Sequence, residues 1–262
     1  MLEKLTISRF GRRISPPGRT KPCIVYSELP DGGEFEAVVK LKAGCETGAA
    51  GLIAEAVAAQ LATDLSLPMP QSCLLEVTKQ FAETVTDEIV RPLFLKSIGW
   101  NFGSKKLPPQ FSTIPTDRIL PINARQTAAE ILAFDAMIQN PDRRRQNPNC
   151  LACGNELMIY DHELGFFIGP SIIGWRPPWE EKSLGFLQNH IFYNQLSGTA
   201  PDFNRLAGAW EGIVSAKIKS YFADLPDEWH PDGSRAVEIR DYLLQLKQYI
   251  PQVIKTIGKA LK

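Results

Sequence analysis

Residues 139–149 read QNPDRRRQNPN, a polar stretch with two prolines and three consecutive arginines. The apolar stretch before it, AAEILAFDAMI at 128–138, reads as a helix, and ELMIYD at 156–161 reads as a strand. A polar loop between two buried elements would be costly in a dry core, because buried polar groups need partners. The pattern therefore predicts that this loop lines a solvated cleft, in which the arginines either contact phosphate or an acidic acceptor or lie in solvent.

Three residues of this region carry side-chain oxygen atoms, and their spacing along the chain is informative. Asn147 follows Asp142 by five residues, and Asp161 comes later, at the end of the predicted strand. Protein kinases use an Asp-x4-Asn loop followed at a similar distance by a second aspartate. There the first aspartate meets the acceptor hydroxyl, and the other two residues bind the Mg²⁺ that bridges the ATP phosphates. The spacing predicts Asp142 as catalytic base and Asn147 and Asp161 as metal ligands.

A lysine and a glutamate precede these residues in the order that a kinase needs. Lys40 lies in AVVKLK at 37–42, and Glu55 follows in an alanine-rich helical segment. Kinases pair such residues so that the lysine holds the α- and β-phosphates of ATP. Strand alternation would place Lys42 on the same face as Lys40. The apolar residues before Lys40 favour Lys40 over Lys42, so Lys40 and Glu55 are predicted to take part in ATP binding.

The sequence gives a weaker indication of the segment that would cover the ATP phosphates. The stretch SPPGRTKP at 15–22 precedes the first long strand and contains one glycine, Gly18. Backbone N–H groups around Gly18 and the hydroxyl of Thr20 are candidates for holding phosphate. An ordinary turn into the strand explains the stretch equally well.

The predicted elements change in type along the chain. The first part is rich in strands, predicted at 22–29, 34–42, 72–77 and 90–98, with one helix at 49–65. A turn at Asp31-Gly32-Gly33 predicts that the first two of these strands form a hairpin. After a proline-rich connector at 103–121, helices are predicted at 123–139, 205–222 and 235–260.

This order predicts an α+β fold with two lobes. Residues 1–103 are expected to form a β-rich N-lobe that binds the ATP phosphates. Residues 104–262 are expected to form a helical C-lobe that carries the catalytic and metal-binding loop. A cleft between two lobes is a natural site for a ligand.

Composition excludes several classes of partner. The formal net charge is zero, so no long-range field favours nucleic acid or an anionic membrane. No apolar run is long enough to span a bilayer, and no signal peptide is evident. An odd number of cysteines without framework spacing predicts a reducing compartment, and we expect a cytoplasmic protein. Cys150 and Cys153 have the spacing of half a zinc site, but two thiols in a β-hairpin are the simpler interpretation.

Together these stretches resemble the HipA-like kinases, in particular their short branch. The resemblance lies in VVKLK (38–42), AEAVAAQLATDLSLPMP (54–70), NFGSKKLP (101–108), FDAMIQNPDRRRQNPN (134–149) and LMIYDHELGF (157–166). It implies a bilobed protein-kinase-like fold, ATP and Mg²⁺ as cofactors, and transfer of a phosphoryl group to a hydroxyl. His162-Glu163 follows Asp161 in place of the Phe-Gly of protein kinases.

The resemblance implies a role for each residue and leaves alternatives open. Lys40 would hold the ATP phosphates, Glu55 would orient Lys40, and Asp142 would be the base, with Asn147 and Asp161 as metal ligands. The acceptor is a protein, with serine or threonine favoured, or a small molecule, and an antitoxin or regulatory partner is possible. The alternatives are a nucleotide-binding pseudokinase that works through partners, and nucleotidyl transfer on the same fold.

Overall fold

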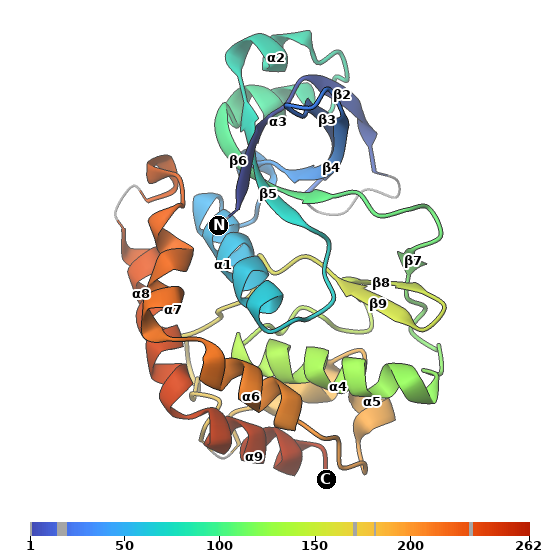
Figure 1. Cartoon of the computed structure of the whole chain (residues 1–262), viewed down its shortest axis with the longest axis vertical. Coiled ribbons are helices and arrows are strands. Elements are labelled where there is room, and N and C mark those ends of the chain that lie inside the picture. The colour runs from blue at the N-terminus through green and yellow to red at the C-terminus, as the bar shows by residue number, and fades with distance from the viewer. Residues whose placement is uncertain (1, 15–19, 170–171, 181, 231–232) are drawn as a thin grey trace.

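The computed structural model describes residues 2–14, 20–169, 172–180, 182–230 and 233–262. Gly18, a predicted phosphate contact, lies outside the described residues. The molecule has two lobes, a β-rich lobe at the top of Figure 1 and a helical lobe below it. The fold class is α+β, as predicted.

A six-stranded sheet forms the β-rich lobe. Its strands are β1 (Glu3–Thr6), β2 (Arg9–Arg13), β3 (Cys23–Glu28), β4 (Glu34–Lys40), β5 (Ser72–Val77) and β6 (Gly99–Lys105). Their spatial order is β1-β5-β6-β4-β3-β2, in which only β1 and β5 are parallel. In the predicted hairpin of β3 and β4, Gly33 N–H donates to Asp31 Oδ1 at 2.9 Å, and Gly32 has a φ of 83° that suits a glycine.

Two short helices cover part of this sheet and form its own apolar core. They are α2 (Lys79–Thr84) and α3 (Arg91–Lys96), and both contribute buried phenylalanines. Phe94 of α3 is fully buried and meets the ring of Phe81 edge-on, at 5.5 Å between centroids. The core of this lobe therefore lies between the sheet and these helices.

The prediction of a strand at 90–98 is wrong, because this segment contains α3. Pro92 lies in the first turn of the helix, where its missing N–H costs nothing and its fixed φ suits the helical conformation. The predicted boundary between residues 103 and 104 lies inside β6, which continues to Lys105. The strands β1, β2 and β6 and the helix α2 were not predicted.

The helix α1 (Ala49–Asp64) lies between the sheet and the helical lobe (Figure 1). Nearly all its residues from Gly51 to Ala62 are apolar and buried, which is typical of a helix surrounded by protein on all sides. It contacts β5 and β6 above and the helices α7 and α8 of the other lobe. Its carboxylate Glu55, 1% exposed, is thereby placed inside the molecule between the lobes.

A second sheet and a second buried helix lie below α1. The helix is α4 (Ile122–Met137), and the sheet consists of β7 (Ser112–Thr113), β8 (Cys150–Cys153) and β9 (Glu156–Ile159). The polar loop of residues 138–149 joins α4 to β8, as predicted. Cys150 and Cys153 lie on the β8 strand of the hairpin, and no group of three or more possible metal-binding side chains occurs within the described residues.

The C-terminal part is helical, but two predicted long helices are each interrupted. It comprises the short helix α5 (Tyr193–Leu196) and then α6 (Asn204–Gly212), α7 (Ser215–Ala223), α8 (Ser234–Gln248) and α9 (Ile250–Ala260). The helix predicted at 205–222 breaks at Ile213 and Val214, where a glycine is followed by two β-branched residues. The helix predicted at 235–260 breaks at Tyr249, because Pro251 lacks an N–H and opens a new first turn.

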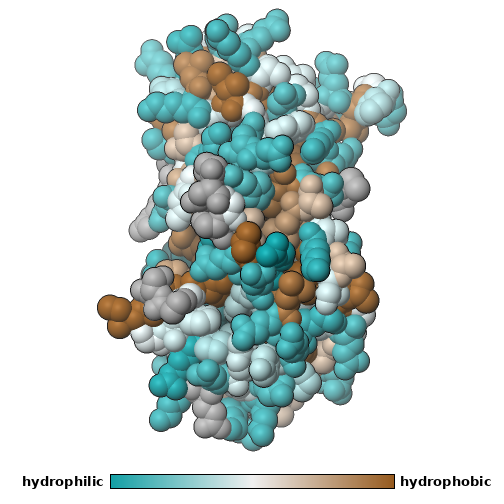
Figure 2. Space-filling model, turned by 90° about the vertical axis from the view of Figure 1, so that its left-hand side faces the viewer, coloured by the Kyte–Doolittle hydropathy of each residue, from teal (hydrophilic) through white to brown (hydrophobic). Residues whose placement is uncertain are grey.

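The face of the molecule that Figure 2 shows is mostly hydrophilic. Figure 2 shows one face of the molecule, on which apolar residues form small and separated patches. In the part of the chain that is described, no helix has the length and apolarity needed to cross a membrane.

Candidate active site

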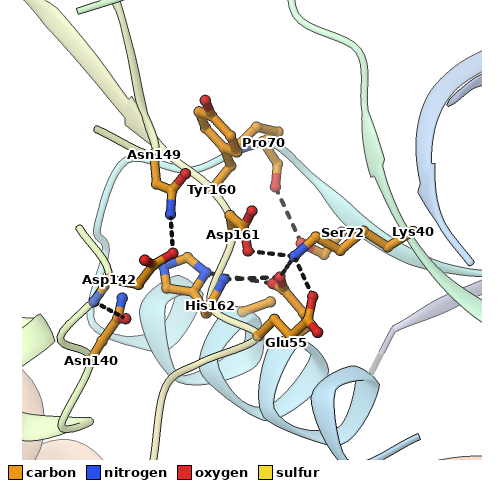
Figure 3. Close-up of polar contacts among 12 residues, drawn as sticks. Lys40, Glu55, Pro70, Ser72, Asn140, Asp142, Asn149, Tyr160, Asp161 and His162 are labelled. Carbon is orange, nitrogen blue, oxygen red and sulfur yellow. Dashed lines mark hydrogen bonds and ion pairs between the residues drawn. The ribbon is translucent and has the colours of Figure 1, made fainter. Parts of the chain in front are cut away.

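Lys40, Glu55 and Asp161 meet at one point between the lobes, which Figure 3 shows. The ammonium of Lys40 forms an ion pair with Glu55 Oε1 and a second one with Asp161 Oδ1, at 2.5 Å. Burial alone lowers the pKa of Lys40, but the charges of Glu55 and Asp161 raise it above its ordinary value. Burial raises the pKa of Glu55, but Lys40 and His162 together bring it below its ordinary value. Both residues of the ion pair are therefore charged.

These three side chains come from three separate parts of the fold. Lys40 is the last residue of β4, Glu55 lies in the middle of α1, and Asp161 follows β9 with a φ of 62°. This left-handed backbone is uncommon for an aspartate and turns the chain sharply after the strand. His162 then donates its backbone N–H to Glu55 Oε1 at 2.9 Å. The segment after β9 is thus bound to β4 through Asp161 and to α1 through the backbone of His162.

Lys42 is not part of this cluster. The strand β4 ends at Lys40, and Lys42 begins the short 3₁₀ helix η1 (Lys42–Gly44). Its backbone N–H donates to the side chain of Asn101 on β6, at 2.8 Å. The expectation that both lysines share a strand face is therefore wrong, because the strand stops before alternation reaches Lys42.

Asp142 lies on the other side of Asp161 from Lys40 (Figure 3). Its Oδ2 accepts hydrogen bonds from Asn147 Nδ2 at 2.5 Å and from Asn149 Nδ2 at 3.1 Å. Its backbone N–H donates to Asn140 Oδ1 at 3.2 Å. Burial, and after it the charge of Asp161, raise the pKa of the Asp142 carboxyl despite these donors. Asp142 is therefore a well-oriented carboxylate with increased basicity.

A tight turn brings Asn147 back to Asp142. Arg144 N–H donates to Asn147 O at 3.1 Å, and Asn147 N–H donates to Arg144 O at 2.9 Å. Arg144 and Arg145 are exposed at this turn, in agreement with the interpretation that the arginines are solvated. The guanidinium of Arg144 lies 3.7 Å from Asp142 Oδ1.

Arg143 differs from its two neighbours, because it is 1% exposed. Its Nε donates to Asp135 Oδ2 at 2.6 Å, and its Nη1 donates to the carbonyl of Tyr160 at 3.1 Å and to that of Asn149. Its Nη2 lies 3.0 Å from His162 Nε2. Arg143 therefore joins α4, the polar loop and the segment that carries Asp161. The interpretation that it contacts phosphate or solvent is wrong.

The partners of two buried histidines determine their tautomers. An arginine can only donate, so His162 Nε2 accepts from Arg143 and Nδ1 carries the hydrogen, 3.7 Å from Glu55 Oε2. His190 Nδ1 accepts from the backbone N–H of Phe192 at 3.2 Å, so its Nε2 donates to Asp135 Oδ2 at 3.0 Å. Burial lowers the pKa of His190. Arg143 thus links Asp135 to the His162 ring, and the backbone N–H of His162 bonds to Glu55.

Asp161 and Asn147 carry oxygen atoms of the kind that a magnesium ion shared with phosphate would need. Asp161 would supply a carboxylate, and Asn147 would supply Oδ1, since its Nδ2 is used on Asp142. Both are hard oxygen donors of the kind that Mg²⁺ prefers. Within the described residues no three acidic, histidine or cysteine side chains could hold a metal ion. Phosphate oxygens and water would therefore have to complete the coordination, which is how Mg²⁺ is held in kinases.

Two other groups of predicted residues lie outside the cluster. Thr20 packs against the η1 turn, where a Cβ on Gly44 would lie 2.6 Å from the carbonyl oxygen of Thr20. Trp175, Trp179 and Phe186 pack against the large apolar core, and the ring of Trp179 stacks on Tyr249 at 4.7 Å between centroids. The aromatic-rich segment 172–196 suits either an acceptor pocket or a packed core, and this packing favours the core.

Sequence reasoning missed the residues that hold the site together. Arg143, His162, Glu163 and Asn149 are all buried and all bond to residues of the site. One signal was present in the sequence. Asp135 is, with Glu130, one of two acidic residues in the apolar segment 128–138, and a buried aspartate needs a cationic partner. Nothing in the local pattern indicates which arginine is that partner.

A family model described as HipA-like kinase matches residues 12–255, a range that contains the whole site. No curated protein matches the chain. Among solved structures, the chain is similar to that of a Helicobacter pylori proinflammatory kinase, CtkA, at 13% identity and a TM-score of 0.49. That match covers 91% of this chain and 94% of the other.

Proposed function

The chain belongs to the HipA-like kinase family, and from this premise we propose that it transfers the γ-phosphoryl group of ATP to an acceptor hydroxyl, with Mg²⁺ as the metal ion. One observation carries the proposal. The ammonium of Lys40 is bonded to Glu55 and to Asp161, and Asp142 lies beyond Asp161 with its carboxylate held by Asn147. This is the arrangement of charges that phosphoryl transfer requires. The favoured acceptor is a serine or threonine of a protein.

Each residue of the site has a stated task in this proposal. Bound ATP and Mg²⁺ supply the phosphoryl group and neutralise its charge. Lys40, oriented by Glu55, presents its ammonium to the phosphates, and Asp161 and Asn147 present oxygen atoms to the metal. Asp142 accepts the proton that the acceptor hydroxyl gives up. Its hydrogen bonds from Asn147 and Asn149 leave Oδ1 as the oxygen for that proton.

Thermal unfolding with and without ATP and Mg²⁺ tests the nucleotide site. A ligand that binds only the folded chain stabilises it by about 2.7 kcal/mol at a hundredfold excess over its dissociation constant. We expect a Mg²⁺-dependent rise of the unfolding midpoint in the wild type and its loss in Asp161→Ala. Asp117→Ala, at an exposed position, is the control and should retain the rise. An equal rise in Asp161→Ala would contradict the metal role of Asp161.

A comparison of two lysines tests the assignment of the phosphate contact. Lys40→Ala is expected to weaken ATP binding by about tenfold or more, because a charged hydrogen bond contributes about 1.5–3 kcal/mol. Lys42→Ala should leave ATP binding nearly unchanged, since Lys42 lies on the η1 turn. Calorimetric titration with Mg-ATP measures both. Loss of affinity only in Lys42→Ala would contradict the assignment.

The nature of the transferred group is tested separately. The mass of a modified acceptor or of the modified chain itself distinguishes phosphoryl from nucleotidyl transfer, because the added groups differ in mass. We expect addition of a phosphoryl group. The cytoplasmic location and an antitoxin or regulatory partner stay predictions from the sequence.

A further inference from the structure

Glu163 is a buried carboxylate that the proposed mechanism does not use. It lies two residues after Asp161 and is 5% exposed. Its Oε1 accepts a hydrogen bond from the backbone N–H of Glu46 at 2.5 Å, in the loop that precedes α1. Its Oε2 lies 3.7 Å from the ammonium of Lys40. The side chain of Glu163 thus contacts both the entrance of α1, which is the loop around Glu46, and the ammonium of Lys40.

The charges around Lys40 are unbalanced. Glu55, Asp161 and Glu163 all lie within ion-pair distance of its single ammonium. A buried carboxylate is costly unless it is paired, and two others nearby increase that cost. Glu55 alone would pair with Lys40, so a third carboxylate needs an explanation. It is explained if Asp161 leaves Lys40 when it turns to a metal ion, because Glu163 then remains as the second partner of the ammonium.

The helix α1 contains a glycine where Glu163 approaches. A Cβ on Gly51 would lie 2.7 Å from Cγ of Glu163 and 2.8 Å from Oγ1 of Thr47. A glycine in a helix costs about 1 kcal/mol relative to alanine, so a gain elsewhere must offset it. Here the gain is the space in which the Glu163 side chain passes along α1 to reach the N–H of Glu46.

We propose that Glu163 is a positioning residue that holds the metal-binding segment against the entrance of α1 and keeps Lys40 in place when Asp161 turns to the metal. The first part, that Glu163 holds the metal-binding segment against the entrance of α1, concerns the chain without any ligand. The second part, that Glu163 keeps Lys40 in place, rests on the proposed function. The two parts can therefore be measured separately.

Hydrogen exchange at the amide of Glu46 tests the first part. Glu163→Gln retains an oxygen that accepts from this N–H, whereas Glu163→Ala removes the acceptor. We expect the amide of Glu46 to exchange slowly in the wild type and in Glu163→Gln, and faster in Glu163→Ala. Glu156→Gln, at an exposed position of β9, is the control and should exchange like the wild type. Unchanged exchange in Glu163→Ala would overturn this part.

The Mg²⁺ dependence of the unfolding midpoint at a fixed ATP concentration tests the second part. In Glu163→Gln the ammonium of Lys40 has one carboxylate fewer and holds Asp161 more strongly. The Mg²⁺ concentration for half of the full midpoint rise should therefore increase by about 10-fold or more, as for other residues that orient metal ligands. The unfolding midpoint without ligand should not fall, since a buried like charge is removed.

The outcomes separate this inference from the proposed function. A wild-type Mg²⁺ dependence in Glu163→Gln overturns the second part of the inference and leaves the proposed function intact. No Mg²⁺-dependent rise in the wild type overturns the proposed function together with the second part. A lower midpoint without ligand in Glu163→Gln, with unchanged Mg²⁺ dependence, limits Glu163 to the first part and overturns the second.

Two glycine variants give a matched test of the space beside Glu163. Gly51→Ala should displace the Glu163 side chain and reproduce the increased Mg²⁺ requirement. Gly258→Ala in α9 is the control, because nothing lies within 4 Å of a Cβ at that position. It should leave the Mg²⁺ dependence unchanged. Equal Mg²⁺ dependence in the two variants would overturn the role of this close approach.

Discussion

Replacement of Asp142 by asparagine is expected to lower the rate of phosphoryl transfer by about 10²–10⁴-fold, the usual contribution of a general base. The asparagine keeps an oxygen that can accept from Asn147 and Asn149, so the loop should retain its shape. ATP binding should stay nearly normal, because this carboxylate is directed to the acceptor and not to the nucleotide. Single-turnover rates and calorimetric ATP titration measure the two effects.

The same measurements include a control and a clear contradiction. Asp117→Asn changes an exposed aspartate and should have the rate of the wild type. An unchanged rate in Asp142→Asn would remove Asp142 from the mechanism. A large loss of ATP affinity in Asp142→Asn would instead indicate that this residue contacts the nucleotide or its metal ion.

Replacement of Arg143 by alanine is expected to lower the free energy of unfolding by about 3–5 kcal/mol, because it leaves a buried carboxylate without its cation. Asp135 is fully buried, and the charge of Arg143 lowers the pKa of its carboxyl against the effect of burial. The carbonyl groups of Asn149 and Tyr160 would also lose their donor. Urea denaturation measures the change.

Arg145 offers a matched control two positions along the same loop. It is exposed, so Arg145→Ala should change the free energy of unfolding by no more than about 0.5 kcal/mol. Equal stability of the two variants would contradict the structural role of Arg143. In the double variant Asp135→Asn, Arg143→Met, the ion pair is replaced by neutral groups. Its loss of stability should be smaller than that of Arg143→Ala alone.

The candidate site was partly predictable, because the order and spacing of its residues can be read from the sequence. Asp142, Asn147 and Asp161 occur in kinase order, and Lys40 and Glu55 precede them in a strand and a helix. The structure brings Lys40, Glu55 and Asp161 into contact and joins Asn147 to Asp142. Their catalytic roles stay predictions until the variants are measured.

The fold was predicted where local chemistry dominates. The hairpin of β3 and β4 follows from a glycine turn between alternating strands, and α1 and α4 follow from long apolar helical stretches. The segment at 90–98 was predicted wrongly, because its apolar residues suit a strand as well as a helix. Its proline, in the first turn of α3, favours the helix.

By itself the sequence determined which chemical groups are present, in which order, and on which kinds of element. Only the tertiary structure decided that Arg143 is buried while Arg144 and Arg145 are exposed, and that Glu163 reaches Lys40. Spacing and periodicity are properties of neighbouring residues, and they can be read along the chain. Burial and pairing depend on groups that are distant in sequence, such as Asp135 with His190 and Lys40 with Asp161. These contacts exist only when the chain has folded.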